Sequence, residues 1–421
     1  MINIDKDYII KLRREIHMYP EVEYDLPKTV ALVKRELESM GVPYTEKYGK
    51  GSVVGYINPD KTDFTIGIRA DMDALRMTEA NDCEYRSRHE GIMHACGHDA
   101  HTAILLGTAK ALKEIESTLS CRVKLVFQPS EEGVTSGAIM MIENGVMEDI
   151  DIMTGLHIGT NLNVGKLGVC PGFSSASSRH FKIEVGGKSV HATAYDKGVD
   201  ALAIAVKMYE GLQSIFANEV SPKERVVCRV TKLHSGTAQN IIPDYALMQG
   251  TIRTFNVPLS GFIHGRIQAL AKSLSDLYGV EIKVHAPLKS TCVYNNPYLS
   301  EIMMKSMEKV VGKENVVEVE YGMGSEDFSR YTDIAPSVFF RLGIRNEEKG
   351  ITQVAHQVDF KIDEDALIYG VQNFVQFVLD NQNGIDMEKL KAAEERKKDR
   401  NYITVRGLMW LLTCRDNTEL P

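Results

Sequence analysis

The chain has 421 residues, of which 43% are hydrophobic and 25% are charged, and its formal net charge is −8. This length exceeds the size at which a single hydrophobic core stops growing, so two domains are expected. The acidic balance, without a basic stripe, argues against nucleic acid as a partner, and no apolar run approaches the roughly 20 residues that span a bilayer.

The first part of the chain is predicted to alternate strands with helices. Residues 7–40 are expected to be helical because Ile9, Leu12 and Ile16 recur at helical spacing. The alternation that follows predicts a mainly parallel sheet covered on both faces. The later elements are expected to be strands at 51–57, 64–70, 123–128 and 150–156 and helices at 100–115 and 137–144.

The pattern changes near residue 178, where a smaller domain is predicted to interrupt the larger one. The expected order over 178–288 is strand, helix, two strands, helix and strand, which is the ferredoxin-like βαββαβ unit. About 110 residues is a reasonable size for an inserted domain. The expected elements are strands at 181–185, 225–233, 245–255 and 280–284 and helices at 199–216 and 260–278.

The first pattern resumes after the insertion, so the larger domain is predicted to comprise residues 1–177 and 289–382. Its last elements are expected at 297–311, at 337–342 and from Asp363 onward. Residues 383–421 form a tail that is almost all charge plus alanine over 388–400 and carries the only tryptophan in the apolar segment 408–412. The sequence leaves open whether this tail docks, frays or mediates assembly.

A Cys-x-His pair indicates half of a metal site. Cys96, His98 and His101 lie within six positions of one another, ahead of an apolar helix. Thiolate and imidazole are the ligands that borderline-soft divalent metals prefer. His101 is ambiguous, because its position in the first turn of the helix also suits a residue that supports a ligand.

The acids and histidines that could complete this site follow predicted strands. Asp71 and Asp73 follow one strand, Glu131 and Glu132 another, and His157 a third. Open parallel sheets build their sites at the carboxyl ends of strands, so these residues point to a single site.

The adjacent acids Glu131 and Glu132 can divide the work of a hydrolytic site. Neighbours in an extended segment point to opposite sides, so one carboxylate can bind metal while the other acts as general base on water. A solvated acidic turn is the alternative, and the bracketing Pro129 and Gly133 after an apolar strand favour function. His157 and His356 are weak signals alone, since a lone histidine is more often a satisfied core residue.

Taken together, the motifs resemble the amidohydrolase branch of the zinc aminoacylase/carboxypeptidase metallopeptidases, which includes hippurate hydrolase, auxin-conjugate hydrolases and aminobenzoyl-glutamate hydrolase. The resemblance covers roughly residues 8–380, in order and at compatible spacing. The motifs are GIRADMDAL, MHACGHDAHTAILLG, LVFQPSEEG, GLHIG, GTAQNIIPD, GTIRTF, MGSEDF and AHQVDFKIDED.

The resemblance implies a metallopeptidase catalytic domain, a ferredoxin-like lid that also dimerises, and a site for two divalent cations drawn from zinc, manganese, cobalt and nickel. Cys96 is the candidate bridge because a thiolate can bind two cations. The implied ligands are Cys96, His98, Glu132, His157 and His356.

The resemblance also assigns catalytic and substrate-binding roles. Glu131 matches the general base, and Asp73, assisted by Asp71, matches the acid that supports the ligands. In the lid, His191 matches a histidine proposed to stabilise the oxyanion. Asn240 and Arg253 match positions suited to the free carboxylate of the substrate, for which a lid turn and a surface ion pair are the alternatives.

Three residues in two segments, Arg76, Ala194 and Tyr195, depart from the family pattern. Arg76 stands where proline usually follows Asp-Ala-Leu, and the lid reads Ala192-Thr-Ala194-Tyr195 where Ala-x-Pro-His is usual. These positions lie near the expected substrate cleft, so they bear on specificity more than on catalysis.

The resulting prediction is an enzyme that hydrolyses N-acyl-L-amino acids to a carboxylic acid and a free amino acid. A dipeptidase or metallocarboxypeptidase, which would prefer a free α-amine, is the alternative within hydrolases. A non-catalytic metal-binding or assembly protein is a third alternative, against which the retained Glu131 argues. We expect a cytoplasmic protein, since seven scattered cysteines indicate reduced thiols and the N-terminal segment lacks the apolar core of a signal peptide. The resemblance also implies a homodimer formed through the lid.

Overall fold

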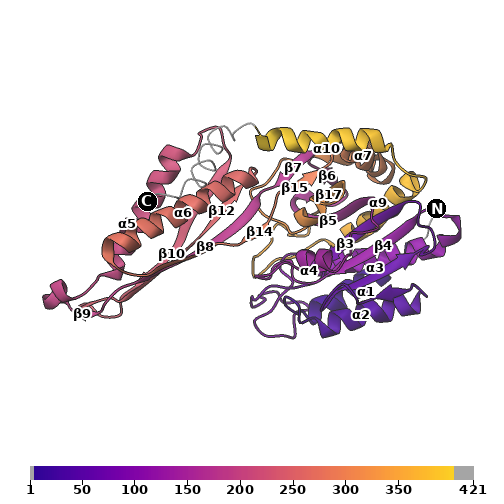
Figure 1. Ribbon diagram of the computed structural model, residues 1–421. Helices are drawn as coiled ribbons and strands as arrows, with labels where there is room; N and C mark the ends of the chain where they lie inside the picture. Colours follow the sequence, from indigo (N-terminus) through magenta and orange to yellow (C-terminus); the bar gives the residue numbers. More distant parts are fainter. Residues whose placement is uncertain (1–3, 403–421) are drawn as a thin grey trace. The chain divides into compact units, whose positions relative to one another are not determined.

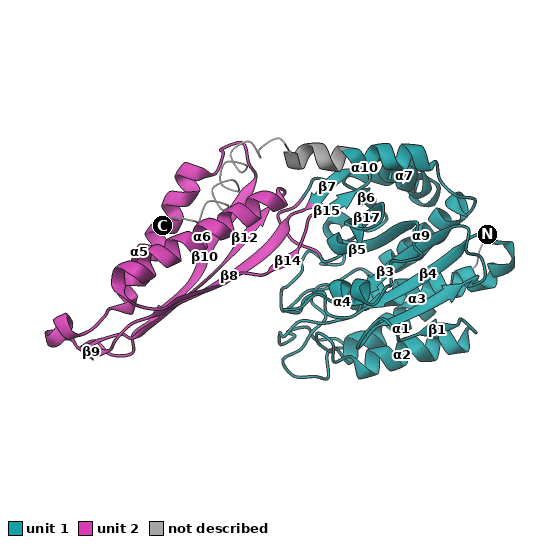
Figure 2. Ribbon diagram, viewed as in Figure 1, with its two compact units in different colours: residues 1–174, 293–321, 327–395 teal, residues 175–292, 322–326, 396–421 magenta. Residues whose placement is uncertain are grey.

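The computed structural model describes residues 4–402, which divide into two compact units (Figures 1 and 2). Within this range, unit 1 comprises residues 4–174, 293–321 and 327–395. Unit 2 comprises residues 175–292, 322–326 and 396–402. The chain therefore leaves unit 1, completes most of unit 2 and returns.

Unit 1 contains an eight-stranded sheet in the order β1-β2-β4-β3-β5-β17-β6-β16. Its central strands run parallel, which confirms the predicted mainly parallel sheet. These strands are β4 (Arg122–Gln128), β3 (Thr65–Asp71), β5 (Ile152–Asn163) and β17 (Ser337–Arg345). The outer strands are β1 (Tyr44–Thr45), β2 (Val53–Ile57), β6 (Leu167–Val169) and β16 (Val316–Glu318).

Alternate residues of the central strands β4, β5 and β17 enter cores on opposite faces of the sheet. In β4, Leu125 and Phe127 belong to a core that also holds side chains of α1, α3 and α9, whereas Val126 packs in a second core with α4. This alternation follows from the two-residue period of a strand, and burial on both faces explains the nearly continuous apolar sequence. The covering helices are α3 (His98–Glu114), α4 (Gly137–Glu143), α7 (Pro297–Val311), α8 (Ser329–Thr332) and α9 (Leu367–Asn381).

The single helix predicted over residues 7–40 is wrong. The structure has two helices there, α1 (Lys6–Met18) and α2 (Pro27–Ser39). Pro20 lies directly after the first helix, and Pro27 opens the second at the position where its missing N–H is not needed. Apolar residues recur at helical spacing on both sides of the break, so the spacing alone predicted one helix although Pro20 and Pro27 mark its interruption.

Unit 2 contains an antiparallel sheet in the order β10-β12-β8-β13, with β14 (Leu288–Ser290) also paired to β8. Helices α5 and α6 pack against this sheet around a separate core. The elements follow in the order β8 (Ser177–Gly186), α5 (Ala201–Glu219), β10 (Val226–Ser235), β12 (Tyr245–Thr254), α6 (Val257–Tyr278) and β13 (Ile282–His285).

The remaining elements are short or terminal. Two small sheets pair β9 (Val190–His191) with β11 (Ile241–Ile242), and β7 (Gly172–Ser175) with β15 (Val293–Asn295). Part of the predicted tail forms α10 (Met387–Tyr402), and the apolar segment 408–412 lies outside the described residues. Among residues 4–402, no helix has the length and apolar character to cross a membrane.

Candidate metal centre

The candidate ligands of unit 1 gather beyond the carboxyl ends of the central strands. β3 ends at Asp71 and β4 ends at Gln128, so the acidic segments of both strands emerge at one edge of the sheet. His157 differs from the prediction in one respect, because β5 does not end before it but continues to Asn163. Gly97 adopts φ +88° between Cys96 and the start of α3, a left-handed conformation that glycine adopts without strain.

Cys96 lies between two histidines from distant parts of the chain. Its Sγ is 3.3 Å from Nε2 of His157 and 3.3 Å from Nε2 of His356. His356 Nε2 also lies 3.1 Å from Oε1 of Glu132. The His356 backbone has φ +69°, a rare conformation for a residue other than glycine, and its N–H donates to Ala95 O at 2.8 Å. The chain is therefore held in a costly conformation that brings this imidazole to the thiol.

His98 is oriented by its backbone contact. Its Nδ1 lies 2.8 Å from the carbonyl oxygen of Asp73, so Nδ1 carries the proton and donates it. Its Nε2 is buried, makes no hydrogen bond among the described residues and lies 3.5 Å from Oδ2 of Asp71. A buried nitrogen with an unused lone pair is costly unless a ligand or ion completes it.

Asp73 holds the segment that carries the paired acids. Its two carboxylate oxygens accept the backbone N–H groups of Glu131 at 2.9 Å and Glu132 at 3.0 Å. Asp73 is fully buried, as expected for a residue that fixes its neighbours and does not contact solvent. The Asp-x-Asp motif thereby sets the position of both glutamates.

The structure resolves the ambiguity over His101. Its Nδ1 donates to Asp71 Oδ1 at 2.6 Å, and its Nε2 accepts the backbone N–H of Ile158 at 3.0 Å. Both ring nitrogens are engaged, so His101 supports the strand that carries His157 and offers no lone pair to a cation.

The electrostatics of the cluster favour positive charge at its centre. Burial alone would lower the pKa of His98, but the charge of Asp71 raises it well above its ordinary value, so this position attracts positive charge, and a bound cation would take the place of the proton on the imidazole. Burial and the charge of His101 hold the pKa of His157 well below its ordinary value, which keeps that imidazole neutral and able to bind metal. Burial and the nearby Glu132 raise the pKa of the Cys96 thiol well above its usual range, so thiolate formation needs a cation nearby.

The donor set fits two cations that share one thiolate. Cys96 belongs to one group with His98 and His157 and to a second with Glu132 and His356, and the ligand atoms of each group lie within 4.8 Å of one another. Thiolate, imidazole and carboxylate donors suit first-row divalent metals. The Nε2 of His98, which makes no hydrogen bond among the described residues, and the negative charge of Asp71 3.5 Å from it agree with this assignment.

The predicted residues of unit 2 form two groups. His191 and Asn240 are both exposed, and they are neighbours, because the Ala192 N–H donates to the backbone oxygen of Asn240 at 2.9 Å. Arg253 is half-buried on β12 and donates through Nε to Thr251 at 3.1 Å.

Two buried charged residues near the glutamates, Arg69 and Asp327, carry no local sequence signal of a functional role. Arg69 donates to Asp71 Oδ2 at 2.7 Å and to Asp327 Oδ1 at 2.8 Å, and all three side chains are buried. An arginine inside an apolar strand was the available signal for this network, since an arginine is almost never fully buried unless paired.

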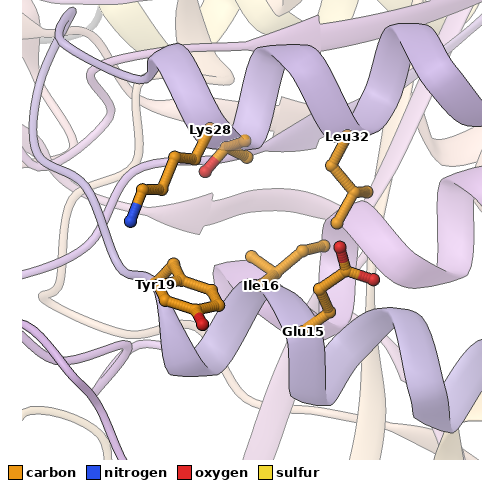
Figure 3. Close-up of a pocket in the computed structure, with 6 residues that line it drawn as sticks. Glu15, Ile16, Tyr19, Lys28 and Leu32 are labelled. Carbon is orange, nitrogen blue, oxygen red and sulfur yellow. The ribbon is translucent and has the colours of Figure 1, made fainter.

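A separate small hollow lies between α1 and α2 (Figure 3). None of the candidate metal ligands lines this hollow, so it is separate from the candidate metal centre. Its lining residues are Glu15, Ile16, Tyr19, Lys28, Thr29 and Leu32.

Comparison with known proteins agrees with this geometry. Residues 67–380 match the family described as Peptidase family M20/M25/M40. The chain belongs to this family. Membership confirms the predicted resemblance and makes the protein a metal-dependent hydrolase of the M20 type.

Individual relatives cover most of the chain. Thermostable carboxypeptidase 1 of Saccharolobus solfataricus is 39% identical over 87% of this chain and 93% of its own length. The IAA-amino acid hydrolase ILR1-like 4 of Arabidopsis thaliana is 36% identical over 86% of this chain and 83% of its own. The crystal structure of a Bacillus subtilis dinuclear metal binding peptidase from the M20 family is 29% identical, covers 89% of this chain and 97% of its own, and has a TM-score of 0.72.

Proposed function

We propose that this M20-family hydrolase cleaves the amide bond of N-acyl-L-amino acids and releases a carboxylic acid and a free amino acid. The proposal rests on the two glutamates that Asp73 holds through their backbone N–H groups, next to the group of potential metal ligands around Cys96. One glutamate, Glu132, lies among the proposed ligands, which leaves Glu131 for acid–base chemistry. An Arabidopsis relative named as an IAA-amino acid hydrolase supports an acylated substrate.

Two divalent cations would be held by Cys96, His98, Glu132, His157 and His356. When bound, two divalent cations polarise the scissile carbonyl and lower the pKa of the attacking water. Glu131 takes the proton of that water and returns it to the leaving nitrogen. Asp73 keeps Glu131 in position throughout, because its contact is to the backbone and not to the reacting carboxylate.

For unit 2, we propose the role of a lid with residues for the oxyanion and the substrate carboxylate. The exposed imidazole of His191 is available to donate to an oxyanion. The neighbouring Asn240 and the guanidinium of Arg253 suit a carboxylate, for which arginine offers a bidentate grip. These roles rest on the family resemblance.

A panel of N-acyl-amino acids that includes hippurate and aminobenzoyl-glutamate tests the function. Enzyme loaded with manganese or zinc is expected to release the amino acid, chelator-stripped enzyme is expected to be inactive, and reloading should restore the rate. Elemental analysis of the same samples identifies which of zinc, manganese, cobalt or nickel is retained and whether two ions bind. Release that is unchanged by stripping would contradict the proposed chemistry.

A carboxypeptidase or dipeptidase activity is the second candidate, because a relative at 39% identity is named as a carboxypeptidase. Relative rates on one dipeptide with and without an N-acyl group distinguish the two. A peptidase should prefer the free α-amine, whereas an amidohydrolase should prefer the acylated form.

We also infer a homodimer formed through unit 2. Leu202, Val206 and Tyr209 of α5 are each 41% exposed, and their spacing places them on one face of the helix. An exposed apolar stripe of this kind is typical of a contact surface. Sedimentation at micromolar concentration is expected to show a dimer, and a monomer alone would refute the inference.

We propose a cytoplasmic location because the cysteines of the described residues form no disulfide. The six cysteines in the described part of the chain form no disulfide, and five of them are buried. Cysteines that form no disulfide are usual in a reducing compartment.

A further inference from the structure

Asp327 is a buried carboxylate with donors on both of its oxygens. Its Oδ1 accepts from Arg69 at 2.8 Å and from Gln128 Nε2 at 2.9 Å. Its Oδ2 accepts from the hydroxyl of Ser136 at 2.7 Å, from Gln128 at 2.9 Å and from the Ala138 N–H at 3.3 Å. The side chain is fully buried, and this set of donors holds its carboxylate in a single orientation.

The donors to Asp327 flank the segment that carries the paired glutamates. Gln128 is the last residue of β4, and Ser136 is the N-cap of α4, the two elements labelled in Figure 1. Residues 129–135 therefore form a loop, and the residues that flank it at both ends, Gln128 and Ser136, donate to this carboxylate. The loop closes tightly, because Gly137 N donates to Ser130 O at 2.9 Å and Ser130 adopts φ +54°. Added bulk at Gly137 is excluded, since a Cβ there would lie 1.7 Å from the Pro129 carbonyl oxygen.

Asp327 also contacts the proposed base directly. Its backbone N–H donates to Oε1 of Glu131 at 3.3 Å. The side-chain carboxylate of Asp327 thus holds the two ends of the loop. Its backbone N–H holds the side chain of Glu131, which lies within that loop. Asp73 anchors the same segment through the backbone N–H groups, so the two acids hold different parts of it.

We propose that Asp327 is a positioning residue for catalysis, which orients the Glu131 carboxylate through the loop closure at Gln128 and Ser136. This inference rests on the proposed function, because it concerns the base of that reaction. Asp327 itself touches neither substrate nor metal in this scheme. A misplaced base raises the barrier to the chemical step and leaves substrate binding largely unaffected.

Asp327→Asn tests the proposal, because asparagine keeps the size of the side chain and removes the charge and one acceptor. We expect kcat to fall by about 10–100-fold with KM near the parent value and both cations retained, as for other residues that orient catalytic groups. The milder Ser136→Gly removes one donor to Asp327 and keeps an acceptable N-cap, so it should give a smaller fall of the same kind.

Lys124→Met is the matched control, because Lys124 is also buried and paired, to Asp149 at 2.6 Å, but has no contact with the loop among those described. It should lower the melting temperature without a selective loss of kcat. Parent-like kcat in both Asp327→Asn and Ser136→Gly would overturn the inference. So would an equal loss of kcat in Lys124→Met, because the effect would then follow stability. An inactive parent enzyme would instead refute the proposed function.

Discussion

Glu131→Gln is expected to lower kcat by about 10²–10⁴-fold, the range that a positioned general base contributes. Glutamine keeps the size of the side chain and can still accept the Asp327 N–H through its carbonyl oxygen, but it cannot take a proton from water. Because Glu131 is largely buried, a carboxylate on the surface of the protein cannot take over its role as base. Steady-state rates on an N-acyl-amino acid, together with metal content, measure the effect.

Glu132→Gln is the contrasting variant at the neighbouring position. Glu132 lies beside His356 and Cys96, so its substitution is expected to reduce the metal content as well as the rate. Glu131→Gln should keep both cations. Substantial turnover in Glu131→Gln would contradict the role of base, and an equal loss of metal in both variants would make Glu131 a ligand.

Much of the site could be predicted from the sequence because its residues follow recognisable elements. Asp71, Asp73 and the paired glutamates come after apolar strands, and parallel strands bring such residues to one edge. His356 could not be placed in this way, since a loop with φ +69° brings it to Cys96 across 260 positions. Its assignment depended on family resemblance.

The support around the ligands was harder to predict than the ligands. His101 has the spacing of a ligand, but hydrogen bonds to Asp71 and Ile158 occupy both of its nitrogens. Only the three-dimensional arrangement of these partners distinguishes support from ligation. Asp327 lies almost 200 positions beyond the loop that it closes, and no local pattern links the two.

The buried ion pairs of Arg69 with Asp71 and Asp327 predict a large loss of stability when Arg69 is replaced. Arg69 is fully buried, and its guanidinium reaches Asp71, Asp327 and Gln128. An ion pair in a low-dielectric interior does not stabilise strongly by itself, because desolvation offsets the attraction. Removing one member is different, since the remaining charges keep their desolvation cost and lose their partner.

Arg69→Met is therefore expected to lower the stability of unit 1 by about 3–5 kcal/mol, the usual effect of breaking a buried pair. Methionine leaves Asp71 and Asp327 in the interior without the cation that both contact. The matched control is Arg35→Met, because the Arg35 side chain is 53% exposed and its partners Glu15 and Glu36 are 32% and 12% exposed, and its effect should stay below about 1 kcal/mol. Urea unfolding of both variants measures the difference. If Arg69→Met and Arg35→Met were equally stable, Arg69 would not be needed to stabilise the buried carboxylates of Asp71 and Asp327. The positive charge that pairs with Asp327 would then not explain how this carboxylate is held at the loop.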